Sequence, residues 1–133
     1  MKERPRIKFR SLRVRPEYRD FVLDQLGRVP DLRSRRMFGG VGIYSGDYFF
    51  ALIAADELFF KVDDSTRAGY EAAGSEPFRP VINRREVSMS YWSVPVEVLE
   101  DPAELALWAR AAIRVAASAP PKPKRRAKRR VKR

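Results

Sequence analysis

The last twelve residues give the clearest indication of chemistry in this chain of 133 residues. This segment holds nine lysines or arginines and no acid: Lys122, Lys124, Arg125, Arg126, Lys128, Arg129, Arg130, Lys132 and Arg133. Such a dense run of cations binds polyanions by releasing their counterions. Nucleic acid is the expected partner, and because phosphates would be the contacts, we expect little sequence preference. Anionic lipid head groups are the second choice, since the run has no Trp, Phe or Leu to insert into a membrane.

Three polar side chains on expected strands form a second candidate site. Arg36, Lys61 and Tyr91 each stand among strongly apolar neighbours. They could line a small anion pocket. In the commoner arrangement, such cations pair with nearby carboxylates, such as Asp63 or Asp64, and cover apolar surface with their stems.

The glycines at positions 39, 40 and 42 could suggest a phosphate-binding loop. A dinucleotide fingerprint requires the glycine-rich turn to lie between a strand and a helix, whereas another strand is expected here. A Walker loop would require Gly-Lys-Ser or Gly-Lys-Thr, which does not occur. The pattern instead favours a bulge or sharp bend against which a ring or backbone packs closely. We therefore expect Gly40 or Gly42 to have a positive φ or no room for a Cβ atom.

Catalytic residue types are scarce. The chain has no Cys and no His, which removes disulfides, thiolate ligands and the commonest general base. Ser90 could pair with Lys61, but the Ser-x-x-Lys spacing and a nucleophile elbow are both missing. The acidic pairs 63–64 and 100–101 stand at expected helix starts, where they cap N–H groups. We therefore predict no catalytic residues, no metal and no cofactor.

The elements that would position these residues follow from periodicity and turn signals. A first helix should begin near Pro16, and a final helix should begin at Asp101 as N-cap, with Glu104 at the capping-box position. A short helix from Arg67 to Ala73 should be capped by Asp64 and closed by Gly74. Five strands are expected at 35–44, 48–54, 58–63, 78–82 and 87–92. The first three are separated by the turns 45–47 and 55–56, and the second strand is central.

This order, α-β-β-β-α-β-β-α, predicts an α+β fold: an antiparallel five-stranded sheet with helices mainly on one face. We expect a basic N-terminal arm at 1–15, a folded domain at 16–118, and a disordered tail rich in Pro, Lys and Arg at 119–133. The arm has seven cations and one acid, and 16–121 has twelve cations and sixteen acids. The total of +11 therefore combines a body of −4 with two basic ends.

Three segments together resemble the N-terminal domain of the bacterial competence regulator TfoX, also called Sxy. They are Arg36-Met37-Phe38-Gly39-Gly40-Val41-Gly42-Ile43-Tyr44, the segment 89–95 and the segment 99–102. The similarity runs from about residue 18 to 117. It implies the α+β fold and a regulator without catalysis that acts at promoters with a catabolite activator protein. Full-length members continue into a second helical domain, whereas here the basic tail follows the first, so the resemblance does not by itself imply competence control.

Three functions remain open at this stage. The first is a regulatory or accessory protein that binds nucleic acid through its tail while the domain contacts a protein partner. The second is a protein–protein adaptor whose tail is incidental, and the third is an enzyme acting on RNA. No apolar run is long enough to span a membrane and the N-terminus lacks an apolar signal region, so a cytoplasmic location is expected. The oligomeric state does not follow from the sequence.

Overall fold

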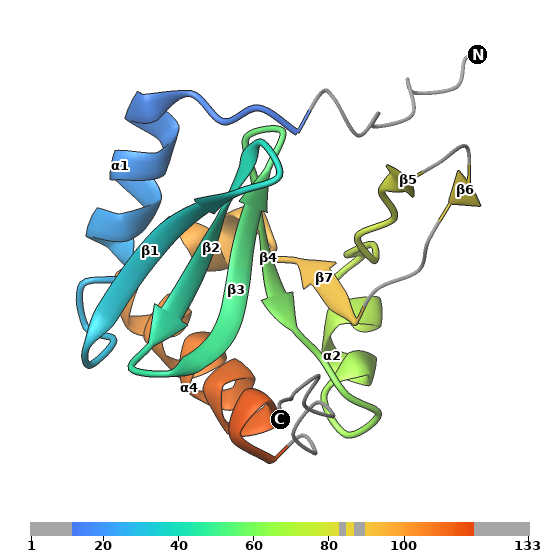
Figure 1. Ribbon diagram of the computed structural model, residues 1–133. Helices are drawn as coiled ribbons and strands as arrows, with labels where there is room; N and C mark the ends of the chain where they lie inside the picture. Colours follow the sequence, from blue (N-terminus) through green and yellow to red (C-terminus); the bar gives the residue numbers. More distant parts are fainter. Residues whose placement is uncertain (1–11, 83–84, 87–89, 119–133) are drawn as a thin grey trace, which may run out of the picture.

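The computed structural model describes residues 12–82, 85–86 and 90–118 (Figure 1). Its main sheet has the strand order β1-β2-β3-β4-β7 with every neighbouring pair antiparallel, and β5 and β6 form a separate two-stranded ladder. This confirms the predicted α+β fold with a five-stranded antiparallel sheet. The helices are α1 (Pro16–Gln25), α2 (Arg67–Ala72), α3 (Val96–Leu99) and α4 (Pro102–Ser118). The strands are β1 (Leu32–Met37), β2 (Gly40–Ser45), β3 (Tyr48–Ala54), β4 (Glu57–Lys61), β5 (Val81–Ile82), β6 (Arg85–Glu86) and β7 (Tyr91–Ser93).

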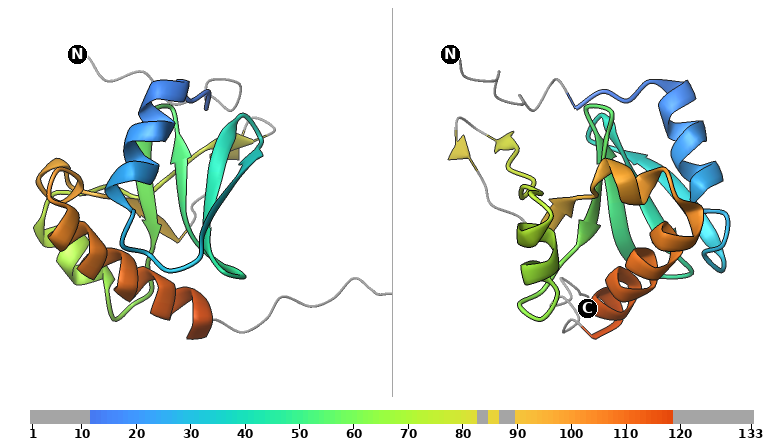
Figure 2. Two further views of the ribbon diagram at one scale, coloured as in Figure 1. Left: turned by 90° about the vertical axis from the view of Figure 1, so that its left-hand side faces the viewer. Right: turned by 180° about the vertical axis from the view of Figure 1, so that it is seen from behind.

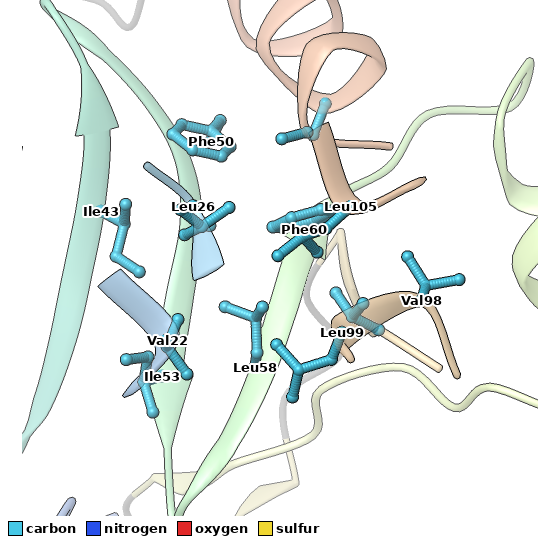
Figure 3. Packing of buried hydrophobic residues seen from close by; sticks show 14 of the residues in the cluster. Val22, Leu26, Ile43, Phe50, Ile53, Leu58, Phe60, Val98, Leu99 and Leu105 are labelled. Atoms are coloured by element: carbon cyan, nitrogen blue, oxygen red, sulfur yellow. The ribbon is translucent and has the colours of Figure 1, made fainter. Parts of the chain in front are cut away.

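Helices α1, α3 and α4 cover one face of the sheet, as the two views of Figure 2 show. Their apolar stripes meet side chains from β2, β3 and β4 to form the main core. Among its fully buried members are Leu26 at the C-cap of α1, Leu105 of α4, and Phe60 of β4 (Figure 3). Burial of such side chains contributes roughly 1.5–3 kcal/mol each.

The strand predicted to be central is central. Positions 50–54 of β3 are buried on both faces, because helices cover one face and a smaller apolar cluster covers the other. The smaller cluster joins Leu52, Phe59 and Tyr91 to Leu12 and Phe78. The β2–β3 ladder also shifts register between Ile43 and Tyr44, a bulge that lets Phe50 enter the main core.

The segment 35–44 was predicted as one strand, and this was wrong. It forms the end of β1 and most of β2, joined by a two-residue turn at Phe38 and Gly39. Both turn residues have positive φ, 52° and 86°, as a type I′ hairpin requires. The sequence lacks the Asn-Gly or Asp-Gly signal of such turns, so the apolar run was taken to continue through it. Pairing along β1 outweighs the cost of placing Phe38 in the left-handed region.

The segment between α2 and α3 also differs from the prediction. Within its described residues, 81–82 and 85–86 pair as a short hairpin away from the main sheet, whereas 91–93 form β7 in the main sheet. Phe78 instead runs beside β7, its N–H donating to the carbonyl of Tyr91 at 2.7 Å. A short helix, α3, follows Pro95 and was not predicted. Positions 83–84, in the predicted connection, and 87–89, in the predicted strand 87–92, lie outside the described residues.

The start of α4 follows the predicted capping, with one contact missing, and the start of α2 differs in one residue. The Asp101 carboxylate accepts from the N–H groups of Ala103 and Glu104 at 3.2 and 3.3 Å, which confirms it as the N-cap of α4. Glu104 does not complete a capping box, because its carboxylate accepts from the Trp108 indole at 3.2 Å. Before α2 it is Asp63, and not Asp64, whose carboxylate accepts from the next N–H groups.

The end of the N-terminal arm that the structure describes is docked. Leu12 is buried, and its carbonyl accepts from the N–H of Ala55 at 3.0 Å. Arg15 contacts the carboxylate of Asp56 through its backbone N–H, at 2.8 Å, and through its guanidinium. These contacts fix the turn at 55–56, where both residues have positive φ. Residues 1–11 of the predicted arm lie outside the described range.

Candidate functional site

Two of the three residues proposed for an anion pocket meet on adjacent strands. Lys61 of β4 stands opposite Tyr91 of β7. The ammonium lies 5.0 Å from the centroid of the Tyr91 ring and donates a hydrogen bond to the Ser90 hydroxyl at 3.1 Å. Such a cation–π contact stabilises the charged lysine. Burial, with a smaller contribution from Tyr44, raises the pKa of Tyr91, so its phenol stays neutral at physiological pH.

The structure places Arg36 apart from this pair. Arg36 lies on β1, an edge of the sheet, with β2 and β3 between it and β4. Its register partner is Val41, which faces the helices, whereas Lys61 shares the opposite face with Tyr91. Three strand spacings separate β1 from β4, roughly 14 Å. The three residues therefore do not converge on one anion.

A depression of about 460 Å³ adjoins Lys61 and is lined by both signs of charge. Asp63, Asp64 and Arg67 lie in it with Lys61, and Asp64 is bridged to Arg67 at 2.8 Å. The hydroxyl of Ser65, more than any other partner, holds the pKa of Asp63 below its usual range, so this carboxylate is ionised. Two carboxylates disfavour an anion at this position.

The last helix ends at the same depression. Ser118, the final residue of α4, lines it together with Val115. The proposed nucleic-acid-binding residues, Lys122 to Arg133, follow from this point and lie outside the described residues.

The contact between Ser90 and Lys61 tests the catalytic alternative. A lysine activates a serine only as the neutral amine, which requires desolvation. Here Lys61 is only half-buried, Ser90 is exposed, and the Tyr91 ring favours a cation beside it. No group of three or more acidic residues within the described ranges is placed to hold a metal ion. The contact between Lys61 and Ser90 therefore does not show the desolvation that this mechanism requires.

The glycine-rich segment behaves as the packing interpretation predicts. A Cβ on Gly40 would lie 2.5 Å from the carbonyl oxygen of Ile53. A Cβ on Gly42 would lie 2.7 Å from the terminal methyl of Met37 and 3.2 Å from the Phe49 ring. These glycines lie in β2 and permit close approach between strands, and β2 is followed by β3 and not by the helix that a phosphate-binding loop requires.

The feature that sequence reasoning missed is the tip of this hairpin. Phe38 is 75% exposed, the largest exposed fraction among the large apolar side chains in the described part of the chain. It directly follows three residues of β1, two of them the exposed arginines Arg35 and Arg36. A signal was present in the sequence, since the two glycines after Phe38 permit a tight turn that would bring the ring to the surface.

Comparison with known families agrees with this architecture. The model of the TfoX N-terminal domain matches residues 24–116, from the end of α1 nearly to the end of α4. The chain belongs to the TfoX N-terminal domain family. The DNA transformation protein TfoX1 of Aliivibrio fischeri is 31% identical over 81 residues, which are 61% of this chain and 37% of that relative. The matched part is thus well under half of the relative's length.

Within the described ranges, no helix combines the length and the apolar character needed to cross a membrane.

Proposed function

We propose that this TfoX N-terminal domain protein is a non-catalytic regulatory or accessory protein that associates with nucleic acid largely through its basic tail. The observation that carries the proposal is the density of charge in residues 122–133, where nine of twelve positions are cations and none is an acid. Each phosphate neutralised by such cations releases counterions, which is a favourable and salt-dependent contribution to binding.

The charge of the folded body supports the same assignment. The segment 16–121 carries a net −4, so the domain as a whole does not attract a polyanion. Cations of the tail that contact the phosphates would offset the repulsion between the acidic domain and the polyanion. Because phosphate contacts carry no base information, the tail should bind unrelated sequences with similar affinity.

The relative's name supports a role connected with DNA. TfoX1 of Aliivibrio fischeri is described as a DNA transformation protein, and this chain matches 37% of it. We extend to this chain only a regulatory or accessory role, acting in the cytoplasm with a possible protein partner on the domain.

Deleting residues 119–133 tests the proposal. The intact and shortened chains are titrated with a duplex at several salt concentrations. If about six phosphates are neutralised, log K of the intact chain should fall with log salt at a slope of roughly −5. The matched control retains the tail's length and replaces its Lys and Arg by Gln. Affinity that survives both changes would overturn the proposal, and a preference beyond about tenfold for one sequence would show that the domain reads bases.

A second function, contact with a protein, has its own observation. An apolar cavity of about 180 Å³ lies on the sheet face opposite the main helices, with Met37, Phe49 and Leu52 in its lining. Apolar depressions of this kind receive apolar side chains of partners. Crosslinking in cells, followed by mass spectrometry, distinguishes the two functions. Recovery of one specific protein that is lost on Met37→Glu, without recovery of nucleic acid, would favour the adaptor.

A further inference from the structure

An apolar groove lies where α1, the turn between β3 and β4, and α3 meet. Its volume is about 440 Å³, and the buried side chains Leu58, Val94 and Leu99 are part of its lining. Phe21 of α1 and Val96 of α3 line it as well, and they are 41% and 63% exposed. They are two of the five large apolar side chains that are exposed within the described residues. Exposed apolar surface is therefore concentrated at this groove.

Hydrogen bonds fix the elements of the groove relative to one another. The side-chain amide of Gln25 in α1 donates to the carbonyl of Leu99 in α3 at 2.8 Å. Arg15, just before α1, donates from its backbone N–H to the carboxylate of Asp56 in the turn at 2.8 Å, and its guanidinium is bridged to the same carboxylate. A partner would therefore meet a preformed surface, which lowers the entropy cost of binding.

Negative charge is concentrated on the same three elements. The segments 16–25, 55–58 and 94–100 hold seven acidic residues and one arginine, a net charge of −6. That arginine is bridged to a neighbouring carboxylate at 3.2 Å. Because 16–121 carries −4 as a whole, the rest of that segment has a net charge of +2. The acidity of the domain therefore belongs to the elements that form the groove.

Three carboxylates line the groove itself: Asp56, Glu57 and Glu100. Glu57 and Glu100 are exposed. Burial, followed by the charges of Glu57 and Asp56, raises the pKa of Tyr18 in the same lining, so its phenol is neutral at physiological pH. Carboxylates in this arrangement repel a polyanion and attract a cation.

We propose that this groove binds a basic peptide segment of a partner protein, which packs one large apolar side chain against Phe21 and Val96. Cations that flank this side chain would pair with Glu57 and Glu100. Apolar burial would supply the affinity, while the carboxylates select a cationic partner and speed its approach. The inference goes beyond the proposed function, because it concerns another surface and a ligand of opposite charge.

A short synthetic peptide tests the chemistry of the occupant. The full-length chain is titrated against fluorescein-labelled Lys-Lys-Leu-Phe-Lys-Lys at low salt, and binding is followed by fluorescence anisotropy. One matched peptide has Ser in place of Leu and Phe, and another has Glu in place of every Lys. Affinity for each should be at least about tenfold lower, because the first lacks an apolar anchor and the second has the wrong charge. Equal binding of any two of the three peptides would overturn the inference.

A substitution in α3 tests the apolar contact. Val96→Ser should lower the affinity for the first peptide about 3- to 10-fold, with little change in Tm because Val96 is mostly exposed. Leu107→Ser is the matched control, since Leu107 is an exposed apolar residue of α4 that does not line the groove, and it should leave the affinity unchanged. Equal losses in the two variants, or no loss in Val96→Ser, would overturn the inference.

The two exposed carboxylates are tested together. Glu57→Gln combined with Glu100→Gln should lower the affinity about 3- to 30-fold at low salt and reduce its dependence on salt. The control combines Asp47→Asn with Glu71→Gln, which removes the same charge from exposed positions outside the groove. It should retain the affinity and the salt dependence of the parent. Equal effects of the two pairs would mean that only net charge matters, and would overturn the site.

The chain's own basic tail is the competing occupant of the groove. Deleting 119–133 should leave the affinity for the first peptide unchanged, whereas peptide binding that appears only after this deletion would assign the groove to the tail and overturn the inference. Val96→Ser should bind a DNA duplex as tightly as the parent does. A clear loss of duplex binding would show that the groove contacts nucleic acid, which would overturn the inference as well.

Discussion

Replacing Gly40 by Ala should destabilise the domain through a single contact. The added Cβ would stand 2.5 Å from the carbonyl oxygen of Ile53, whereas ordinary contacts begin at 3.4 Å. The backbone at Gly40 is not in the left-handed region, so the change introduces no strain in φ. Relief requires β2 and β3 to separate by several tenths of an ångström, at the point where Val41 pairs with Ile53. Both strands are buried there, so neither can move freely.

The magnitude follows from two opposing effects. Overpacking of this kind typically costs about 1–3 kcal/mol. Against it, Ala restricts the unfolded chain and returns about 0.4–1 kcal/mol. The free energy of unfolding should therefore fall by roughly 1–2 kcal/mol, which lowers Tm by roughly 4–16 °C for a domain of this size. Urea denaturation followed by the fluorescence of Trp92 and Trp108 measures the change.

The control is the same substitution at Gly69. This residue lies in α2, and no atom stands within 4 Å of the place that a Cβ would take, so Ala should stabilise the helix by up to about 1 kcal/mol. Opposite signs for the two variants would confirm that the contact with Ile53 decides the outcome. If Gly40→Ala unfolds at the same or a higher urea concentration than the parent, the close approach of β2 to β3 is not as described, and the reasoning fails.

Three further predictions concern the same domain. Gly42→Val should lower the free energy of unfolding by about 1–3 kcal/mol, because the side chain meets Met37 and Phe49, without loss of nucleic-acid affinity; a variant that melts like the parent but no longer binds would contradict this. Deleting 119–133 should leave Tm unchanged in a calorimetric scan, since no core residue is removed, and a clear fall would show that the tail packs on the domain. Asp63→Asn should weaken the acid sensitivity of folding. Because the pKa of Asp63 is lower in the folded than in the unfolded state, its carboxylate stabilises the fold above the unfolded pKa of about 4, and this contribution is lost as the pH falls through the folded pKa. Between about pH 5 and about pH 3, the free energy of unfolding measured by denaturation should therefore fall further in the parent than in Asp63→Asn.

Where the sequence predicted structure well, one physical preference dominated. Pro16 and Asp101 mark helix starts because few other positions suit a missing N–H or a capping carboxylate, and both starts are where they were expected. The apolar run of β3 has no polar face, so only a central strand buries it. These assignments follow from the properties of the residues themselves, and the packing of the folded domain favours the same structures.

Where the prediction was wrong, long-range packing overrode a local signal. Phe38 occupies a turn conformation that its own propensity disfavours, because β1 gains a full ladder with β2 only if the chain reverses there. β4 ends at Lys61, two residues before the expected end, and the carboxylate of Asp63 in the following turn, not that of Asp64, accepts from the N–H groups that precede α2. Arg36 and Lys61 looked alike as cations among apolar residues, and only the strand order shows that β2 and β3 separate them.

The position of β1 at the edge of the sheet has a consequence for the protein at high concentration. In the described part of the chain no strand pairs with the outer side of β1, so its backbone groups there are open to another chain. Exposed edges of this kind template aggregation through strand pairing. Three of the six residues of β1 are arginines, and two copies approaching edge to edge would bring like charges together. Repulsion between these arginines would therefore oppose edge-to-edge pairing of two copies, and their replacement by apolar residues should favour self-association through this edge.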